Sequence, residues 1–177
     1  MKGIFAALLL MVSMHTLLAQ KTFTVTNDKQ LHQPVYTGQV TFDDLNNEKA
    51  FDWLRKGYEN YTPDKNTVSF LSAHLSNYGI IVFLGTWCGD THNLLPKFEK
   101  VLQQTGYPQS KLTMYALDME KKGTNGENEK YNISRVPTFI VLKNGKEIGR
   151  ITESVKKSIE SDLTAILQAD KGQPSHQ

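Results

Sequence analysis

The pattern of apolar and polar positions is regular from residue 79 onward. Residues 80–84 are an unbroken run of β-branched, aromatic and aliphatic side chains, which predicts a strand buried on both faces. After a short loop, apolar residues recur at helical spacing over residues 94–102, so we expect an amphipathic helix there. Gly106 and Pro108 follow, and together they predict the end of that helix.

Three further strands are expected after this helix. Residues 111–117 form a second apolar run, which indicates another buried strand. The polar stretch 118–130 predicts a surface loop with a helical turn at its end. Residues 138–143 and 146–151 flank Asn144-Gly145, a dipeptide typical of two-residue β-hairpin turns. The last two strands are therefore expected to be antiparallel.

A closing helix completes the regular part of the chain. Apolar residues at helical spacing over 155–167 predict it, with Ser154 as its N-cap and Gly172 just past its end. The order of elements is then β-α-β, a β-hairpin and a helix. That order places the chain in the α/β class.

A less regular extension precedes this core. Residues 22–26 alternate between apolar and polar positions, as in a short strand. Residues 48–58 carry a helical pattern that Pro63 ends, and a second helix over 68–78 runs into the first core strand. We interpret the turn at Pro63 as a turn within one domain and not as a linker between two domains.

The first twenty residues have the pattern of an export signal. Lys2 supplies a positive start, residues 4–12 are apolar, and the small Ala19 precedes Gln20. Because the apolar run is short for a bilayer span, we expect cleavage before Gln20 and export to the periplasm or cell envelope; an uncleaved anchor is the alternative. The expected organisation is, in chain order, a signal peptide at 1–19, an extension packed on the core at 20–78, a core at 79–170 and a flexible tail at 171–177.

Charge and cysteine content narrow the possible partners. The formal net charge is +2, and loss of Lys2 with the signal would leave it near neutral, so neither nucleic acid nor an acidic membrane is expected as a partner. The sequence holds one cysteine, Cys88, so no disulfide can form within the chain. A lone thiol is unusual in an exported protein and points to a chemical role.

Several of these pieces together resemble the thioredoxin superfamily. The strand at 80–84 is followed by Trp87-Cys88-Gly89-Asp90-Thr91, by Pro96 in the next helix and by Val136-Pro137-Thr138 before the hairpin. The resemblance covers roughly 79–168, and more narrowly the chain is similar to exported thioredoxin-like proteins of Bacteroidetes-type bacteria. It implies a thioredoxin-like fold, with a central mixed β-sheet flanked by helices and an N-terminal helical extension.

The resemblance implies that Cys88 is the reactive residue. It would lie where a buried strand meets a helix N-terminus, a position whose unpaired N–H groups and dipole favour a thiolate. Trp87 would shape the surface beside it. Pro137 matches the family's cis proline, which faces the cysteine and leaves the backbone of Val136 free to pair with an extended substrate near Thr138. An ordinary trans turn proline is the alternative.

Three departures from the family pattern limit what Cys88 can do. Thr91 stands where thioredoxins carry a second cysteine, and a hydroxyl cannot attack a mixed disulfide. Val82 occupies the place of the family's buried acid, and Met114 that of the lysine beside it. The sequence therefore predicts a protein that is not a dithiol disulfide reductase but retains one thiol for exchange.

Other polar residues are candidates for supporting roles. The resemblance places Arg135 near the thiol, where it could stabilise an anion; an ordinary surface arginine is the alternative. His92 lies four residues after Cys88, so it could donate to the thiolate or join it in holding a soft metal ion, while an exposed first-turn histidine is the simpler interpretation. Asp90 supports the helix start next to Gly89. We expect no metal site, because two ligands do not close one.

Three functions follow as hypotheses. The first is a monothiol oxidoreductase, in which Cys88 exchanges disulfides with protein or small-molecule thiols without a cofactor. The second is a non-catalytic module that holds a peptide in the groove around Trp87 and Val136. The third is a metal carrier resting on Cys88, His92 and a ligand from a partner.

Overall fold

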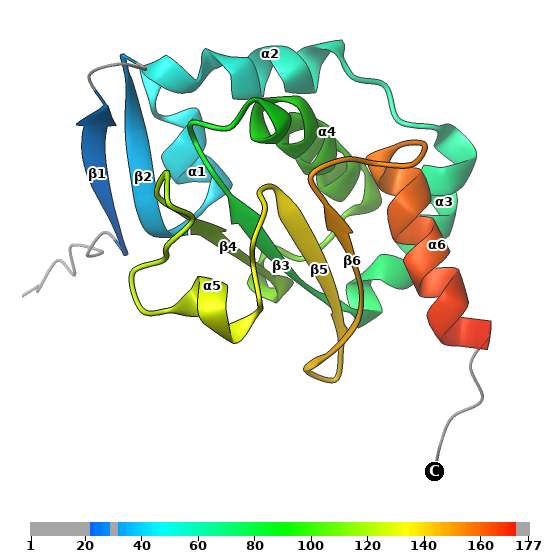
Figure 1. Ribbon diagram of the computed structural model, residues 1–177. Helices are drawn as coiled ribbons and strands as arrows, with labels where there is room; N and C mark the ends of the chain where they lie inside the picture. Colours follow the sequence, from blue (N-terminus) through cyan, green and yellow to red (C-terminus); the bar gives the residue numbers. More distant parts are fainter. Residues whose placement is uncertain (1–21, 29–31, 173–177) are drawn as a thin grey trace, which may run out of the picture.

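Six strands form one mixed sheet at the centre of the molecule (Figure 1). The computed structural model describes residues 22–28 and 32–172, so the expected signal peptide and most of the expected tail lie outside the described residues. The strand order across the sheet is β1-β2-β4-β3-β5-β6. The strands are β1 (Phe23–Asp28), β2 (Gln33–Val40), β3 (Gly79–Leu84), β4 (Leu112–Ala116), β5 (Thr138–Lys143) and β6 (Lys146–Thr152).

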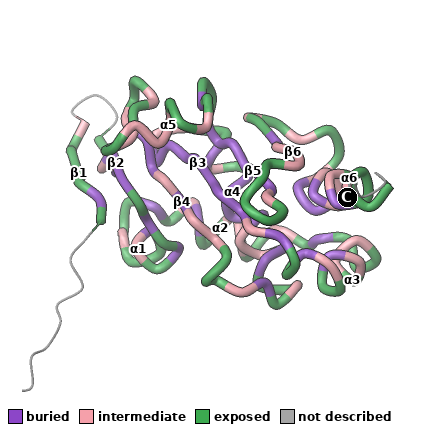
Figure 2. Tube along the Cα trace, turned by 90° about the horizontal axis from the view of Figure 1, so that it is seen from below, coloured by how far each residue is buried: buried purple, intermediate pink, exposed green. Residues whose placement is uncertain are grey.

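Helices cover the two faces of this sheet unequally. The helices are α1 (Phe42–Asn46), α2 (Asp52–Asn60), α3 (Lys65–His74), α4 (Gly89–Thr105), α5 (Glu127–Lys130) and α6 (Ile159–Gly172). Helix α4 contacts α2, α3 and α6. The short helix α5 lies on the other side of the sheet from α1, α2 and α3 (Figure 2). In the described part of the chain, none of these helices is long and apolar enough to cross a membrane.

Strand β3 is central and buried on both faces, as its apolar run predicts. It pairs in parallel with β4 and antiparallel with β5, which confirms the mixed sheet. Ile80, Val82 and Leu84 join the larger core beneath the helices. Ile81 and Phe83 join a smaller core on the opposite face. A strand buried on both sides fixes the position of the loop that follows it.

The helix and hairpin predictions of the core are confirmed. Helix α4 begins directly after Cys88 and ends at Gly106, whose φ of 65° is the left-handed conformation that glycine adopts readily. The β5–β6 hairpin turns at Asn144 and Gly145, with φ values of 50° and 78°. Both values are positive, as a type I′ turn requires.

The closing helix differs from its prediction at both ends. Helix α6 begins at Ile159, four residues later than expected, and includes Gly172. Ser154 is not its N-cap. Instead the hydroxyl of Ser158 accepts from Ser161 N at 3.3 Å, and its carbonyl accepts from Asp162 N at 2.9 Å. The second serine in the segment is therefore the one that satisfies the free amides of the first turn.

The extension contains more structure than the sequence pattern indicates. The short strand and both helices are present, although α3 ends at His74 and a 3₁₀ turn follows it. Strand β2 and helix α1 are additional to the predicted elements. In β2 the cause is that Pro34 and Gly38 interrupt the alternation of apolar and polar residues. Helix α2 lies close to α4: a Cβ on Gly57 would be 2.5 Å from Cγ of Pro96. The extension is therefore packed tightly on the core.

Candidate active site

Cys88 occupies the N-cap position of α4 and is half-buried. Its Sγ lies 3.3 Å from the carbonyl oxygen of Val136, so residues 48 apart in the chain meet here. The Val136–Pro137 peptide bond is cis, as the resemblance implies, and both residues are buried. The thiol therefore lies between the N-terminus of α4, where the helix dipole is positive, and the turn that precedes β5.

Trp87 forms one wall of this site. Its indole Nε1 donates a hydrogen bond to the carbonyl of Leu117 at 3.0 Å, which links the reactive loop to the end of β4. The ring lies against Gly85, where a Cβ would be 2.7 Å from the indole Cε2. The close approach of this ring therefore requires a glycine at position 85. Together with the hydrogen bond to Leu117, it fixes the orientation of the Trp87 side chain beside Cys88.

Thr91 is completely buried in the first turn of α4. Its hydroxyl accepts from Gly85 N at 3.3 Å, so it ties the helix to the end of β3. The residues that replace the family's acid and lysine are neighbours in the β3–β4 ladder, where Val82 pairs with Met114. Both are buried, so an apolar contact stands in place of that ionisable pair.

His92 is neither exposed nor hydrogen-bonded to the thiol, contrary to both interpretations of the sequence. Its Nε2 lies 2.7 Å from the carbonyl oxygen of Thr86. Its ring stacks on Trp53 of α2, with centroids 4.2 Å apart and planes inclined by 20°. The reason is that α2, from the extension, covers this side of α4, which the local sequence around His92 does not reveal.

Arg135 pairs with a carboxylate instead of the thiol. Its Nη1 lies 2.6 Å from Glu153 Oε2 across the turn that holds Pro137, and its side chain remains 64% exposed. Thr138 closes the same turn, since its hydroxyl donates to the carbonyl of Arg135 at 2.7 Å. Asp90 is exposed in the first turn of α4, as expected of an acid that supports a helix start.

The described residues include no group of three or more His, Cys, Asp or Glu side chains close enough to hold a metal ion. His92 is already bonded to a carbonyl, so a metal site formed with Cys88 would have to break that contact and take its other ligands from a partner.

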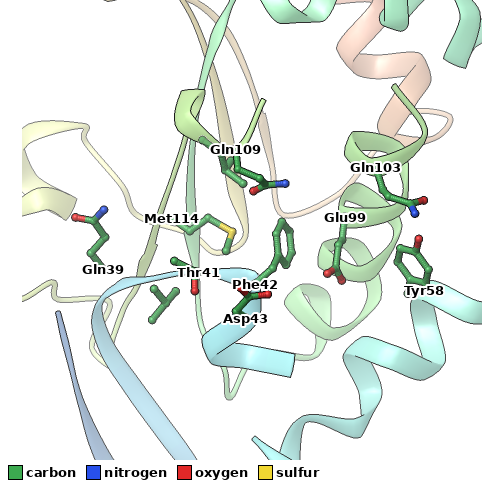
Figure 3. A pocket seen from close by; sticks show the side chains of 11 residues that line it. Gln39, Thr41, Phe42, Asp43, Tyr58, Glu99, Gln103, Gln109 and Met114 are labelled. Carbon is green, nitrogen blue, oxygen red and sulfur yellow. The ribbon is translucent and has the colours of Figure 1, made fainter. Parts of the chain in front are cut away.

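A separate cavity of about 440 Å³ lies between α1, α2, α4 and strands β2 and β4 (Figure 3). Glu99 and Asp43 line it together with apolar groups such as Phe42 and Met114. Burial raises the pKa of Glu99, a hydrogen bond from Asn46 Nδ2 at 2.9 Å opposes this, and the Asp43 carboxylate adds to the rise. No local sequence pattern predicts this cavity, because its lining residues come from six separate elements.

The Glu99→Gln variant is expected to be more stable than the wild type at pH 7. Glu99 has a higher pKa in the folded chain than in the unfolded chain. The folded state therefore loses stability as the pH rises from the pKa of the unfolded chain to that of the folded chain. Glutamine removes this penalty and keeps an oxygen that can accept from Asn46. Urea unfolding at several pH values measures the difference, which should vanish below about pH 4.

The matched control is Glu129→Gln, at an exposed glutamate of α5. We expect it to change the free energy of unfolding by less than about 0.5 kcal/mol at either pH. A Glu99→Gln protein that is no more stable than the wild type at pH 7 would contradict the assignment of a penalised carboxylate.

A thiol at a strand–helix junction, facing a buried cis proline within a mixed sheet, defines a thioredoxin-like site. The thioredoxin family model matches residues 64–165, more than half of the chain, and the chain belongs to this family. It is 31% identical over 105 residues to Thioredoxin-1 of Saccharomyces cerevisiae, covering 59% of this chain and 96% of that protein. It is also 31% identical over 83 residues to thioredoxin of Echinococcus granulosus, covering 47% and 72% of the two chains.

Solved structures with similarity include two thioredoxins. Thioredoxin O2 from Arabidopsis thaliana in the oxidized state is 21% identical, with 59% of this chain and 83% of that chain covered and a TM-score of 0.38. The reduced Schistosoma mansoni thioredoxin pre-protein is 26% identical, with 60% and 90% covered and a TM-score of 0.38. The family match begins at residue 64, so β1, β2, α1 and α2 lie outside it.

Proposed function

We propose that this protein is an exported monothiol member of the thioredoxin family that exchanges disulfides through Cys88 in the periplasm or cell envelope. The observation that carries the proposal is the 3.3 Å approach of Cys88 Sγ to the Val136 carbonyl beside the cis proline. The chain retains this arrangement although Thr91 occupies the place of a second sulfur. The narrower resemblance to exported Bacteroidetes-type proteins and the apolar N-terminal run support export.

The reaction requires two exchange steps. The Cys88 thiolate attacks one sulfur of a substrate disulfide, forms a mixed disulfide with it and expels the other sulfur as a thiolate, which takes up a proton. A second thiol, from a small molecule or a protein, then attacks the substrate sulfur of the mixed disulfide and releases Cys88. The electrons come from that external thiol, which ends in a disulfide with the substrate. Thr91 cannot perform this second step.

The backbone beside the thiol supports recognition of an extended substrate. Within the described residues, the amide of Val136 donates no hydrogen bond. Pro137 has no N–H, so no ladder bond from the next residue competes at this edge. An extended peptide that pairs with Val136 would bring its own sulfur to Cys88, and Thr138 closes the turn from behind.

The folded protein is expected to exchange with a peptide disulfide at least about tenfold faster at pH 7 than the same chain unfolded in urea, because the fold holds Cys88 Sγ beside the turn at Val136, where an extended substrate can pair. The rate is measured by mass spectrometry of the mixed disulfide, with a cysteine-containing model peptide run in both solvents to correct for urea. A folded chain that reacts no faster than the unfolded one would refute the proposal. N-terminal sequencing of protein from the periplasmic fraction tests cleavage before Gln20.

A peptide-binding module without redox chemistry is the second candidate. The apolar Val82–Met114 contact favours it, because no ionisable group there can assist proton transfer. The Cys88→Ser variant distinguishes the two functions. If the protein is a binding module, this variant should bind a cysteine-free peptide as tightly as the wild type does. If it is an exchange protein, it retains substrates only through the mixed disulfide, and the variant should not retain them.

A further inference from the structure

The loop that carries Cys88 is hydrogen-bonded to residues of the N-terminal extension that lie outside the region that matches the family. Thr86, two residues before the cysteine, is completely buried. Its hydroxyl accepts from Tyr36 N at 3.2 Å and donates to the carbonyl of Pro34 at 3.1 Å. Both partners belong to β2, so the side chain of Thr86 ties this strand of the extension to the reactive loop.

A second element of the extension holds the backbone of the same residue. The carbonyl of Thr86 can only accept, so the Nε2 of His92 at 2.7 Å must carry the hydrogen of this bond. The imidazole plane is set in turn by Trp53 of α2, on which it stacks. Trp53, His92 and Thr86 therefore form a chain of contacts, which we call the loop clamp, from α2 to the reactive loop.

The clamp acts on the backbone of Cys88 at short range. The amide of Cys88 donates to the carbonyl of Gly85 at 3.0 Å, and its own carbonyl accepts from His92 N at 3.0 Å. His92 thus contacts the loop twice, by its backbone at Cys88 and by its ring at Thr86. A change in the direction of the imidazole would shift the contact with Thr86, two residues before the thiol, and with it the backbone that carries Cys88.

Trp53 packs against the core and also stacks on the ring of His92. Its Nε1 is buried and, in the described part of the chain, has no hydrogen-bond partner. A buried unpaired donor is destabilising, and a phenylalanine would avoid this cost while filling much of the same space. Neither packing nor stacking needs the indole N–H, so the part of Trp53 that the clamp uses is its ring face, which stacks on His92.

We propose that the N-terminal extension is part of the reactive site, and that Trp53, His92 and Thr86 are positioning residues that orient Cys88 toward its substrate. The inference rests on the proposed exchange function and deepens it. It assigns to β2 and α2, which lie outside the family match, the task of holding the reactive loop.

The test compares exchange rates of full-length variants with a peptide disulfide, after circular dichroism has shown each to be folded. We expect Trp53→Ala and Thr86→Val to lower the rate constant about tenfold or more, because small misplacements of a reacting group are costly. Trp53→Phe and Thr86→Ser keep the ring stack and the hydroxyl, respectively, and should recover most of the rate. His92→Phe keeps a stacked ring but loses the bond to Thr86, so it should react as slowly as Thr86→Val.

Leu71→Ala is the control for general destabilisation. Leu71 is completely buried in α3 and does not belong to the clamp, so this variant should lose stability and keep the wild-type rate. An equal loss of rate in Leu71→Ala, or a wild-type rate in folded Trp53→Ala and His92→Phe, would overturn the clamp. A wild type that is itself no faster than its unfolded chain would instead overturn the exchange function, so the two failures are distinct.

Discussion

The Thr91→Cys variant is expected to catalyse the reduction of insulin by dithiothreitol at least about tenfold faster than the wild type, because an adjacent thiol attacks a mixed disulfide at a high effective concentration. Thr91 lies one turn after Cys88 on α4 and is completely buried, so a cysteine of similar size can take its place. The hydrogen bond from Gly85 N to the hydroxyl would weaken, since sulfur is a poor acceptor. Turbidity of the released insulin chain measures the rate.

The controls separate the new thiol from a mere loosening of the loop. Thr91→Ser keeps the hydroxyl and should remain as slow as the wild type. Thr91→Cys combined with Cys88→Ser keeps the new sulfur without the nucleophile and should also be slow. If the double variant is as fast as Thr91→Cys, or if Thr91→Cys shows no gain, the assignment of Cys88 as nucleophile with Thr91 in the resolving position is wrong.

The Phe98→Ala variant is expected to lose about 3–5 kcal/mol of folding free energy, the range for truncating a buried aromatic residue. Phe98 is completely buried on the inner face of α4. Its ring lies 4.8 Å from that of Phe139 in β5, so it joins the helix of the thiol to the strand behind the cis proline. Urea unfolding followed by circular dichroism measures the loss.

Because domains of this size have only about 5–15 kcal/mol of total stability, a sizeable part of the Phe98→Ala protein should unfold at moderate temperature. Met119→Ala is the control: this side chain is 47% exposed, and its removal should cost less than about 0.5 kcal/mol. A loss below about 1 kcal/mol for Phe98→Ala would contradict the packing between α4 and β5.

Both predictions concern α4, which has two separate tasks. Its first turn presents Cys88 to the turn at Val136, and its later turns anchor that presentation in the core. Thr91 occupies the position of the family's second cysteine. Its hydroxyl forms a structural hydrogen bond with Gly85 N instead of taking part in exchange. The proposed function rests on both features: Cys88 lies where it could attack a substrate, and the hydroxyl of Thr91 could not perform the release step.

Features that depend on neighbours along the chain could be predicted from the sequence. The apolar run of β3, the helical spacing of α4 and the Asn144-Gly145 turn predicted their elements, because backbone conformation responds to local pattern. The position of Cys88 at the N-terminus of its helix followed instead from the resemblance. The partnership of Cys88 with Pro137 came from the resemblance, whose motif fixes both positions in one fold.

The distant groups that the side chains of the site contact could not be predicted in this way, because they depend on how the elements pack. His92 stacks on Trp53, Arg135 pairs with Glu153, and Thr86 bonds to β2, and no local spacing relates these partners. Strand β2 escaped prediction for a similar reason, since its pairing with β1 and β4 outweighs a weak local pattern. Hydrogen bonds and ring contacts are specific to a few ångströms, and only the packing of whole elements brings groups so far apart in the chain within that range.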